Sequence, residues 1–170
     1  MDLGFLMSVA KPTRYTGGEV NEVRKEERPG LLHVALAFPD AYELAMSTMG
    51  LKILYAILNA REDVWAERVF MPMPDMEQAL IERGQPLYGL ESKRPLSAFD
   101  LVGFTLQFEL TYTNILHMLR LGGVPARASE RGPSDPVVVA GGPCAVNPEP
   151  LSPFFDAFFV GDGEEAVTIT

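Results

Sequence analysis

Short apolar runs alternate along the chain with stretches in which apolar residues recur every three or four positions. Runs of this length and composition are typical of strands that are buried on both faces of a sheet. Glycine, proline or aspartate bounds each run. The pattern therefore predicts five buried strands, at 32–38, 66–71, 101–106, 137–141 and 157–160.

The stretches with helical spacing predict helices after the first three strands. A hydroxyl of Ser47 or Thr48 is the expected cap of the first helix, and the Asp75 carboxylate is the expected cap of the second. A further helix is expected to begin after the fifth strand, where the sequence ends. The first three helices are predicted over 51–59, 76–84 and 110–121.

Two segments fall outside this alternation. Residues 1–30 have little helix or strand pattern, and we interpret them as an N-terminal arm that packs on a neighbouring domain. Residues 31–170 then form the α/β domain, which is about one domain in length. Within it, residues 84–98 are rich in glycine, proline and charge and predict an irregular connection.

The order of these elements favours a doubly wound, mostly parallel sheet, because right-handed crossovers place helices on both of its faces. The predicted fold class is α/β and flavodoxin-like, with five strands in the order 2-1-3-4-5. In such sheets a ligand binds outside the carboxyl ends of the strands. The candidate site segments are therefore the loops at 39–49, 107–111, 141–147 and 161–165.

Charge and cysteine content exclude several classes of function. The chain has 14 Lys and Arg against 23 Asp and Glu, and its net charge of −9 repels nucleic-acid phosphates and anionic lipid headgroups. A single cysteine, Cys144, rules out an internal disulfide and an iron–sulfur cluster held by several thiolates of this chain. The apolar stretches of the chain are shorter than the roughly 18 residues of a membrane span. We therefore expect a cytoplasmic domain without nucleic-acid or membrane partners.

Four glycines follow the fourth and fifth strands, at Gly141, Gly142, Gly161 and Gly163. A glycine at a strand end lets the backbone turn sharply, or it lets a flat ligand lie against the main chain. A phosphate is disfavoured because acidic residues follow Gly161, and these suit the first turn of a helix. The four glycines are candidate ligand contacts, with a plain turn and capped helix as the alternative.

Polar residues after the first and third strands complete the candidate site. Asp40, Tyr42 and Ser47 follow the first strand, and Gln107 and Glu109 follow the third. We expect these side chains to line a crevice, because the carboxyl ends of parallel strands meet at one edge of the sheet. For Glu109 the alternative is that it only complements the dipole of the following helix.

The remaining reactive side chains are interpreted as structural. His33 lies within a predicted strand and His117 within a predicted helix, so each is expected to be packed or hydrogen-bonded. They lack a third donor at metal-ligand spacing, and no metal site is predicted. Cys144 is expected to act as a small buried apolar residue. No catalytic residue is assigned.

Several stretches carry a resemblance to a known family. They resemble the N-terminal, cobalamin-binding-like domain of an uncharacterised radical SAM protein family, over nearly the whole chain. The stretches are KPTRYTGGE at 11–19, FPDAYELAMSTMGLKILYAILN at 38–59, FDLVGFTLQFELTYTN at 99–114 and GGPCAVNPEPLSPFFDAFFVGDGEEAV at 141–167.

The resemblance implies where the radical chemistry takes place. Radical SAM enzymes cleave S-adenosylmethionine at a [4Fe–4S] cluster held by a CxxxCxxC motif, and this motif is absent here. The cluster and S-adenosylmethionine are therefore expected in a downstream catalytic domain, which would be the partner of this one. The chain alone is expected to have no radical activity.

The resemblance also raises cobalamin as a cofactor. Histidine-ligated corrinoid domains carry D-x-H-x-x-G after the first strand, and here the corresponding residues run from Asp40 to Ala45 with Tyr42 in place of histidine. Only base-off binding, without a histidine ligand, is compatible with this stretch. The nucleotide tail of such a corrinoid is expected to pass over Gly141, Gly142 and Gly161.

Three functions remain open on the sequence. The first is an accessory domain of a radical SAM enzyme that holds a corrinoid or the substrate over the strand ends. The second is an interaction domain of the same fold that binds no cofactor and packs on the catalytic barrel or on a macromolecular partner. The third is an independent receptor for a flavin or another small molecule, which the lack of a phosphate-binding loop disfavours.

Overall fold

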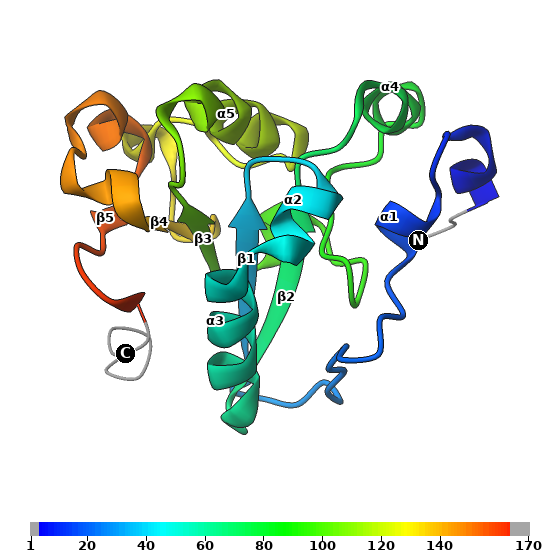
Figure 1. The fold of residues 1–170 in the computed structure, drawn as a ribbon, viewed down its shortest axis with the longest axis horizontal. Helices are drawn as coiled ribbons and strands as arrows, with labels where there is room; N and C mark the ends of the chain where they lie inside the picture. Colours follow the sequence, from blue (N-terminus) through cyan, green and yellow to red (C-terminus); the bar gives the residue numbers. More distant parts are fainter. Residues whose placement is uncertain (1–3, 164–170) are drawn as a thin grey trace.

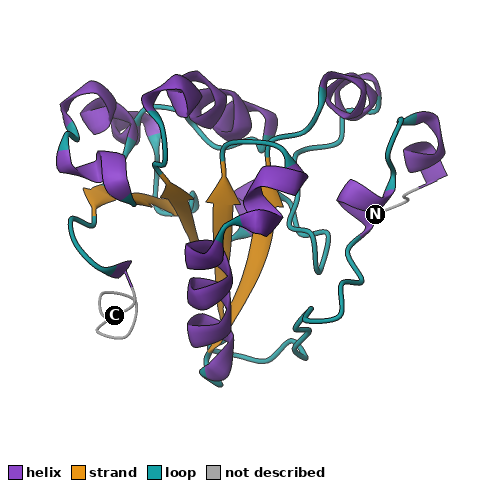
Figure 2. Cartoon of the chain, viewed as in Figure 1, coloured by secondary structure: helices purple, strands orange, loops and turns teal. Residues whose placement is uncertain are grey.

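A parallel sheet of five strands lies at the centre of the computed structural model, which describes residues 4–163 (Figures 1 and 2). The order of the strands is β2-β1-β3-β4-β5, and every neighbouring pair is parallel. The α/β, flavodoxin-like fold and its strand order are therefore confirmed. The strands are β1 (Leu32–Phe38), β2 (Val64–Phe70), β3 (Leu101–Thr105), β4 (Val137–Gly141) and β5 (Ala157–Phe158).

The predicted strands differ from the observed ones mainly at β2 and β5. β2 begins two residues earlier than predicted, because Val64 and Trp65 pair with Leu32 and His33 at the start of β1. β5 keeps only two of its four predicted residues, and these pair with Val139 and Ala140 of β4. The helix expected after β5 lies outside the described residues.

Five α-helices and six short 3₁₀ helices are assigned in the described residues. Each of the first three crossovers contains at least one α-helix, as predicted. The α-helices are α1 (Thr13–Thr16), α2 (Tyr42–Ser47), α3 (Met49–Ala60), α4 (Pro74–Glu82) and α5 (Tyr112–Leu121). The 3₁₀ helices are η1 (Gly4–Ser8), η2 (Leu96–Ala98), η3 (Glu109–Thr111), η4 (Ala128–Glu130), η5 (Pro143–Val146) and η6 (Glu149–Phe154).

The predicted helix caps are wrong. Ser47 ends α2, and although Thr48 precedes α3, both hydroxyls donate backwards to the Leu44 carbonyl oxygen, at 2.7 and 3.0 Å. The Asp75 carboxylate lies inside the first turn of α4, where its Oδ2 accepts a hydrogen bond from the Ala10 main-chain nitrogen at 2.7 Å. Tertiary contacts and local turns use the oxygens that the sequence pattern assigned to capping.

Two apolar clusters cover the two faces of the sheet. Alternate residues of β1 face opposite sides, so that Val34 and Leu36 pack with α3 while Ala35 and Ala37 pack with α5. In Figure 1, α3 runs alongside the lower part of β1 in the foreground, and α5 lies at the top of the view. The sheet is therefore doubly wound, as predicted.

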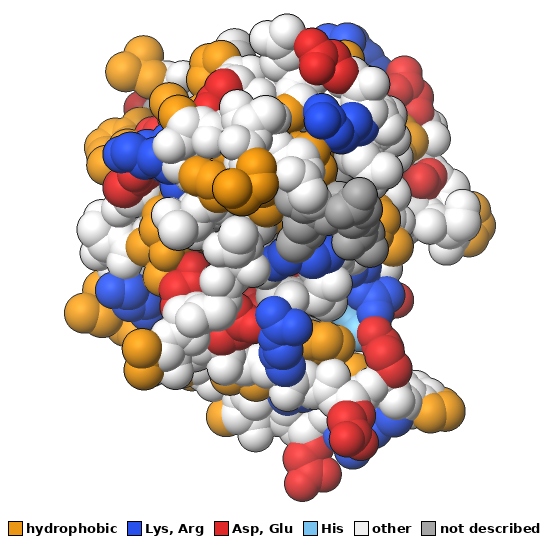
Figure 3. Space-filling view, turned by 90° about the vertical axis from the view of Figure 1, so that its right-hand side faces the viewer, with side chains coloured by type: hydrophobic (Ala, Val, Ile, Leu, Met, Phe, Trp, Pro, Cys, Tyr) orange, Lys and Arg blue, Asp and Glu red, His pale blue; other side chains and the backbone are white. Residues whose placement is uncertain are grey.

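The N-terminal arm packs on this domain. A third apolar cluster joins Phe5, Leu6 and Tyr15 of the arm to Met76 and Leu80 of α4. The arm then passes beside α3 and β2. Figure 3 shows acidic and basic side chains intermixed on the arm side of the molecule. An additional contact of the arm with a neighbouring domain stays a prediction.

The connection at 84–98 covers the free edge of β2. The Leu90 main-chain nitrogen donates to the Arg68 carbonyl oxygen at 2.8 Å, and a single bridge joins Tyr88 to Pro95 within the connection. Backbone groups of an edge strand that are already paired in this way are not open to another chain. The irregular connection was predicted, but its function as an edge cover was not.

Replacing Leu119 by alanine tests the core beneath α5. Leu119 is fully buried in this cluster, so Leu119→Ala is expected to lower the free energy of unfolding by about 2–5 kcal/mol. The matched control is Leu110→Ala in η3, whose side chain is 93% exposed and whose loss should change stability by less than about 0.5 kcal/mol. Urea unfolding followed by circular dichroism measures both. Equal losses would contradict this placement of the core.

Candidate functional site

The carboxyl edge of the sheet brings together three of the predicted site residues. At the exits of β3 and β4, the Gln107 side-chain amide donates to the Thr105 hydroxyl at 2.6 Å, and the Cys144 thiol donates to the Gln107 carbonyl oxygen at 3.5 Å. Glu109 and Gly142 lie at the same two exits. Gln107, Glu109 and Gly142 therefore share one part of the edge.

Cys144 is half-buried at this position rather than fully buried as expected. Desolvation raises the pKa of its thiol, and the neighbouring Glu109 carboxylate raises it further. A thiol with a raised pKa forms less of the reactive thiolate at neutral pH. The expectation that Cys144 is unreactive is consistent with this environment.

Gly142 is required by the packing of the chain itself. Its φ is +101°, and a Cβ atom at this position would lie 3.1 Å from both the main-chain nitrogen and the carbonyl oxygen of Leu106. The same region is closed by hydrogen bonds from Leu106 to Gly141 and from Cys144 to Leu106, at 2.7 and 3.0 Å. The space that a side chain would occupy is therefore next to β3 backbone.

The other three glycines have different surroundings. A Cβ on Gly141 would be 3.8 Å from Phe159, and a Cβ on Gly161 would meet no described atom within 4 Å, although its φ is +123°. A Cβ on Gly163 would lie 3.5 Å from Leu54 of α3. Gly163 thus lies against a helix on one face of the sheet, away from the exits of β3 and β4.

The polar residues after β1 are used within the domain. The Tyr42 hydroxyl donates to Glu19 of the arm at 2.9 Å, and its ring packs edge-on against Phe70. The Asp40 carboxylate accepts a hydrogen bond from the next main-chain nitrogen at 2.7 Å, and Ser47 donates to the preceding turn. Tyr42 is therefore turned toward β2 and the arm, and the exit of β1 does not join the group at β3 and β4.

Exposed apolar side chains gather along the same carboxyl edge. They follow three adjacent strands, β1, β3 and β4, and none of them is needed to fill the core. Single exposed apolar residues are normal, whereas a contiguous exposed patch is typical of an interaction surface. The row, called here the apolar edge, consists of Leu44, Met49, Phe108, Leu110 and Val146.

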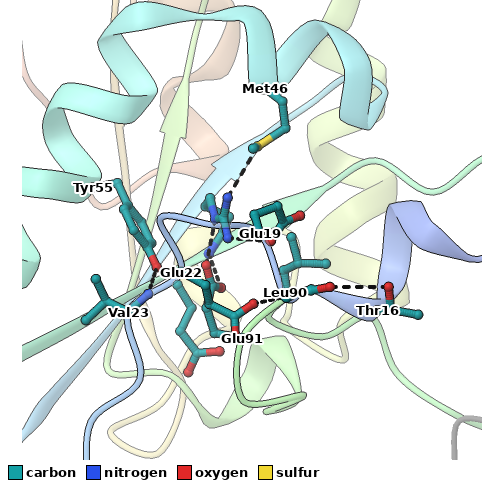
Figure 4. Close-up of polar contacts among 12 residues, drawn as sticks. Thr16, Glu19, Glu22, Val23, Met46, Tyr55, Leu90 and Glu91 are labelled. Carbon is teal, nitrogen blue, oxygen red and sulfur yellow. Dashed lines mark hydrogen bonds and ion pairs between the residues drawn. The ribbon is translucent and has the colours of Figure 1, made fainter.

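A buried ionic cluster around Arg68 was missed by the sequence interpretation. Arg68 of β2 donates from Nε to Glu91 at 2.6 Å, from its main-chain nitrogen to the same carboxylate at 2.8 Å, and from Nη2 to Glu19 at 2.9 Å. Figure 4 shows Glu19, Glu91, Met46 and Tyr55 converging on one point from four segments. Adjacent Glu67 and Arg68 inside an otherwise apolar strand were the signal that could have revealed it.

The cluster contains more buried acid than base. Glu67 and Glu91 are both fully buried, and Ser92 donates its main-chain N–H to Glu67 at 2.7 Å. Burial raises the pKa of Glu91 to about 7 even though Arg68 opposes the shift, and the nearby Glu67 carboxylate adds to it. Near neutral pH the Glu91 carboxyl is therefore only partly ionised.

Both histidines lie beside carboxylates, and His33 is buried and packed, as the structural interpretation predicted. Nε2 of His33 lies 3.1 Å from Glu27, and its ring contacts Trp65. Nε2 of His117 lies 3.0 Å from Glu77. Between residues 4 and 163, no group of three His, Cys, Asp or Glu side chains is placed to hold a metal ion.

Gly142→Ala tests whether the chain itself requires this glycine. The added Cβ would meet Leu106 backbone in a conformation that other residues avoid, so the free energy of unfolding should fall by about 1–3 kcal/mol. Gly50→Ala in α3 is the control, because nothing lies within 4 Å of its Cβ position and alanine favours a helix. Thermal melts compare the two. A fully stable Gly142→Ala protein would show that the close approach is absent.

The pH dependence of stability tests the buried Glu91. Its folded pKa of about 7 lies above the usual glutamate pKa of 4.5, so the folded protein keeps a proton that the unfolded chain releases between these two pH values. The stabilisation is complete below pH 4.5 and is lost as the pH rises through 7, by up to about 3 kcal/mol. Urea unfolding at pH 5 and pH 8 should show this loss in the wild type and a smaller one in Glu91→Gln. Parallel pH profiles would contradict it.

The chain is similar in sequence to known proteins. The chain is 25% identical over 133 residues to an uncharacterized protein of Methanocaldococcus jannaschii, in a match that covers 78% of this chain and 24% of that protein. No solved structure matches the chain. No helix among residues 4–163 is long and apolar enough to cross a membrane. The family model described as "Radical SAM proteins, N-terminal" matches residues 50–170, and the chain therefore belongs to this family.

Proposed function

We propose that the chain is an accessory domain that docks on the catalytic domain of a radical SAM protein through the carboxyl edge of its sheet. The observation that carries the proposal is the apolar edge, where Phe108, just before η3, and Leu110, within η3, are exposed to solvent. A solvent-exposed leucine beside an exposed phenylalanine gains about 2 kcal/mol or more when a partner covers it. Family membership supplies the partner, because an N-terminal domain of this family implies a catalytic domain.

The surroundings of the predicted crevice support docking over ligand burial. At the β1 exit, Asn114 of α5 donates to the Pro39 carbonyl oxygen at 2.9 Å, and Tyr42 is bonded to the arm. At the β4 exit, the space beside Gly142 is taken by Leu106 backbone. These contacts join neighbouring loops to one another and present their apolar side chains outward. Loops held in this way form a firm surface for another domain.

The docking surface also has polar groups that can orient a partner. Glu109 is exposed between Phe108 and Leu110, and Tyr112 and Gln107 lie beside it. Interfaces between domains of one protein bury about 600–1,500 Å² and combine apolar contacts with polar ones at the rim. In this proposal the [4Fe–4S] cluster and S-adenosylmethionine are bound by the catalytic domain, and this domain contributes no radical chemistry.

A corrinoid is the second candidate. The polar group at Gln107, Glu109 and Cys144 favours it, because these side chains surround a strand exit where a flat ligand could lie. The chain does not fit a deeply buried nucleotide tail, because the Gly142 backbone already contacts β3. Tyr42 stands where histidine-ligated corrinoid domains have the histidine that binds cobalt. Its hydroxyl is hydrogen-bonded to Glu19. We therefore assign no step to a corrinoid.

Hydrogen exchange of the chain alone and joined to its catalytic domain tests the docking proposal. Amides at 106–111 and 42–50 should exchange at least about tenfold more slowly in the joined protein, because docking excludes water from the apolar edge. The double variant Phe108→Glu and Leu110→Glu should remove this protection. The control is Ile81→Glu, an equally apolar exposed residue on α4 and away from the edge. Unchanged protection in the double variant would overturn the proposal.

Hydroxocobalamin distinguishes the second candidate. After mixing and desalting, the docking proposal expects no corrinoid absorbance to remain with the chain, alone or joined. Retained absorbance that is lost in Glu109→Gln would instead place a corrinoid at the exits of β3 and β4.

A further inference from the structure

A groove lies between the N-terminal arm and α3, on the face of β2 that carries Arg68. Its volume is about 510 Å³, within the roughly 300–1,000 Å³ of small-molecule sites. Val23 of the arm forms one wall, Leu51, Tyr55 and Ala56 of α3 form the other, and Arg68 lies at the floor. Figure 4 shows Val23, Tyr55 and Met46 around this point. The residues that line the groove are not those of the apolar edge.

At the floor, one N–H donor of Arg68 has only a weak acceptor. Arg68 gives Nε and Nη2 to the carboxylates of Glu91 and Glu19, whereas Nη1 donates to the thioether sulfur of Met46 at 3.4 Å. Sulfur is a weak acceptor. The guanidinium is already paired with the Glu19 carboxylate and shares the Glu91 carboxyl, and Glu67 is buried nearby, so a further anion is disfavoured there. The floor therefore suits a neutral oxygen or an apolar group.

The mouth of the groove differs from the floor because its cation, Lys52, has no acidic partner among the described residues. Lys52 is exposed on α3, and none of the described residues forms an ion pair with its ammonium group. It lies four residues before Ala56 and therefore on the same side of the helix. An anionic group at the mouth can pair with Lys52, while the groove below it offers the ring of Tyr55 and aliphatic walls.

We propose that this groove binds a small amphipathic organic acid. The apolar body packs between Val23, Leu51 and Tyr55, and its single anionic group pairs with Lys52 at the mouth. The ligand carries one charge, because Glu19 at the rim and the net charge of −9 oppose a polyphosphate. Tyr55 stays neutral and keeps its hydroxyl oxygen on the Val23 main-chain nitrogen at 2.8 Å, which holds the two walls in register.

The test uses two probes of equal shape, 2-naphthoate and 2-naphthamide, and the full 170-residue chain. The ¹³C-methyl resonance of Met46, at the base of the groove, reports binding by NMR titration. Naphthoate should shift this resonance to saturation. Lys52→Met should weaken naphthoate by about threefold to fivefold, the value of one exposed ion pair, and leave naphthamide unchanged.

A filled groove provides the second arm of the test. Ala56 is exposed, so Ala56→Trp places a ring in the groove without disturbing the core, and it should abolish binding of both probes. Gln78→Trp adds the same ring to the exposed side of α4 and is the matched control. Circular dichroism confirms that each variant is folded. No shift of Met46 in the wild type, or undiminished binding by Ala56→Trp or Lys52→Met, would overturn the proposal.

Discussion

The pairing of Arg68 with two carboxylates holds together the parts of this domain that the sheet alone does not connect. Glu91 belongs to the connection that covers the edge of β2, and Glu19 belongs to the arm. A buried guanidinium is tolerated only when its hydrogen bonds are satisfied, so both segments must be in place before Arg68 can be buried. Arg68 therefore couples the arm to the edge cover, beside the groove between arm and α3.

The strand order was predictable because it follows from a periodic pattern and a rule of chirality. Five apolar runs separated by helices leave few topologies, and right-handed crossovers select among them. Boundaries were less predictable where pairing, rather than apolar content, decides them. Val64 and Trp65 belong to β2 because β1 offers partners for them. The caps failed for a related reason, since Asp75 bonds to a residue of the arm 65 positions away.

The site was predictable only as far as loop position decides it. Gln107, Glu109 and Gly142 meet because parallel strands end at one edge. Tyr42 turns away because Glu19, far off in the sequence, accepts its hydrogen bond. Gly142 is glycine because Leu106 backbone lies beside it, and a sequence pattern does not distinguish this cause from a bound ligand. The ionic cluster of Arg68 was not predicted, because a buried strand is recognised in a sequence by its apolar residues.

The contacts of Val23 with Tyr55 and Trp65 bear on where the N-terminal boundary of the domain lies. The Val23 N–H donates to the Tyr55 hydroxyl, and the Trp65 indole donates to the Val23 carbonyl oxygen. If a segment that begins at β1 were transferred to another protein, Val23 would be missing. Tyr55 and Trp65 would then lose a hydrogen-bond partner. A domain graft should therefore keep the arm with the sheet, at least from Val23 onward.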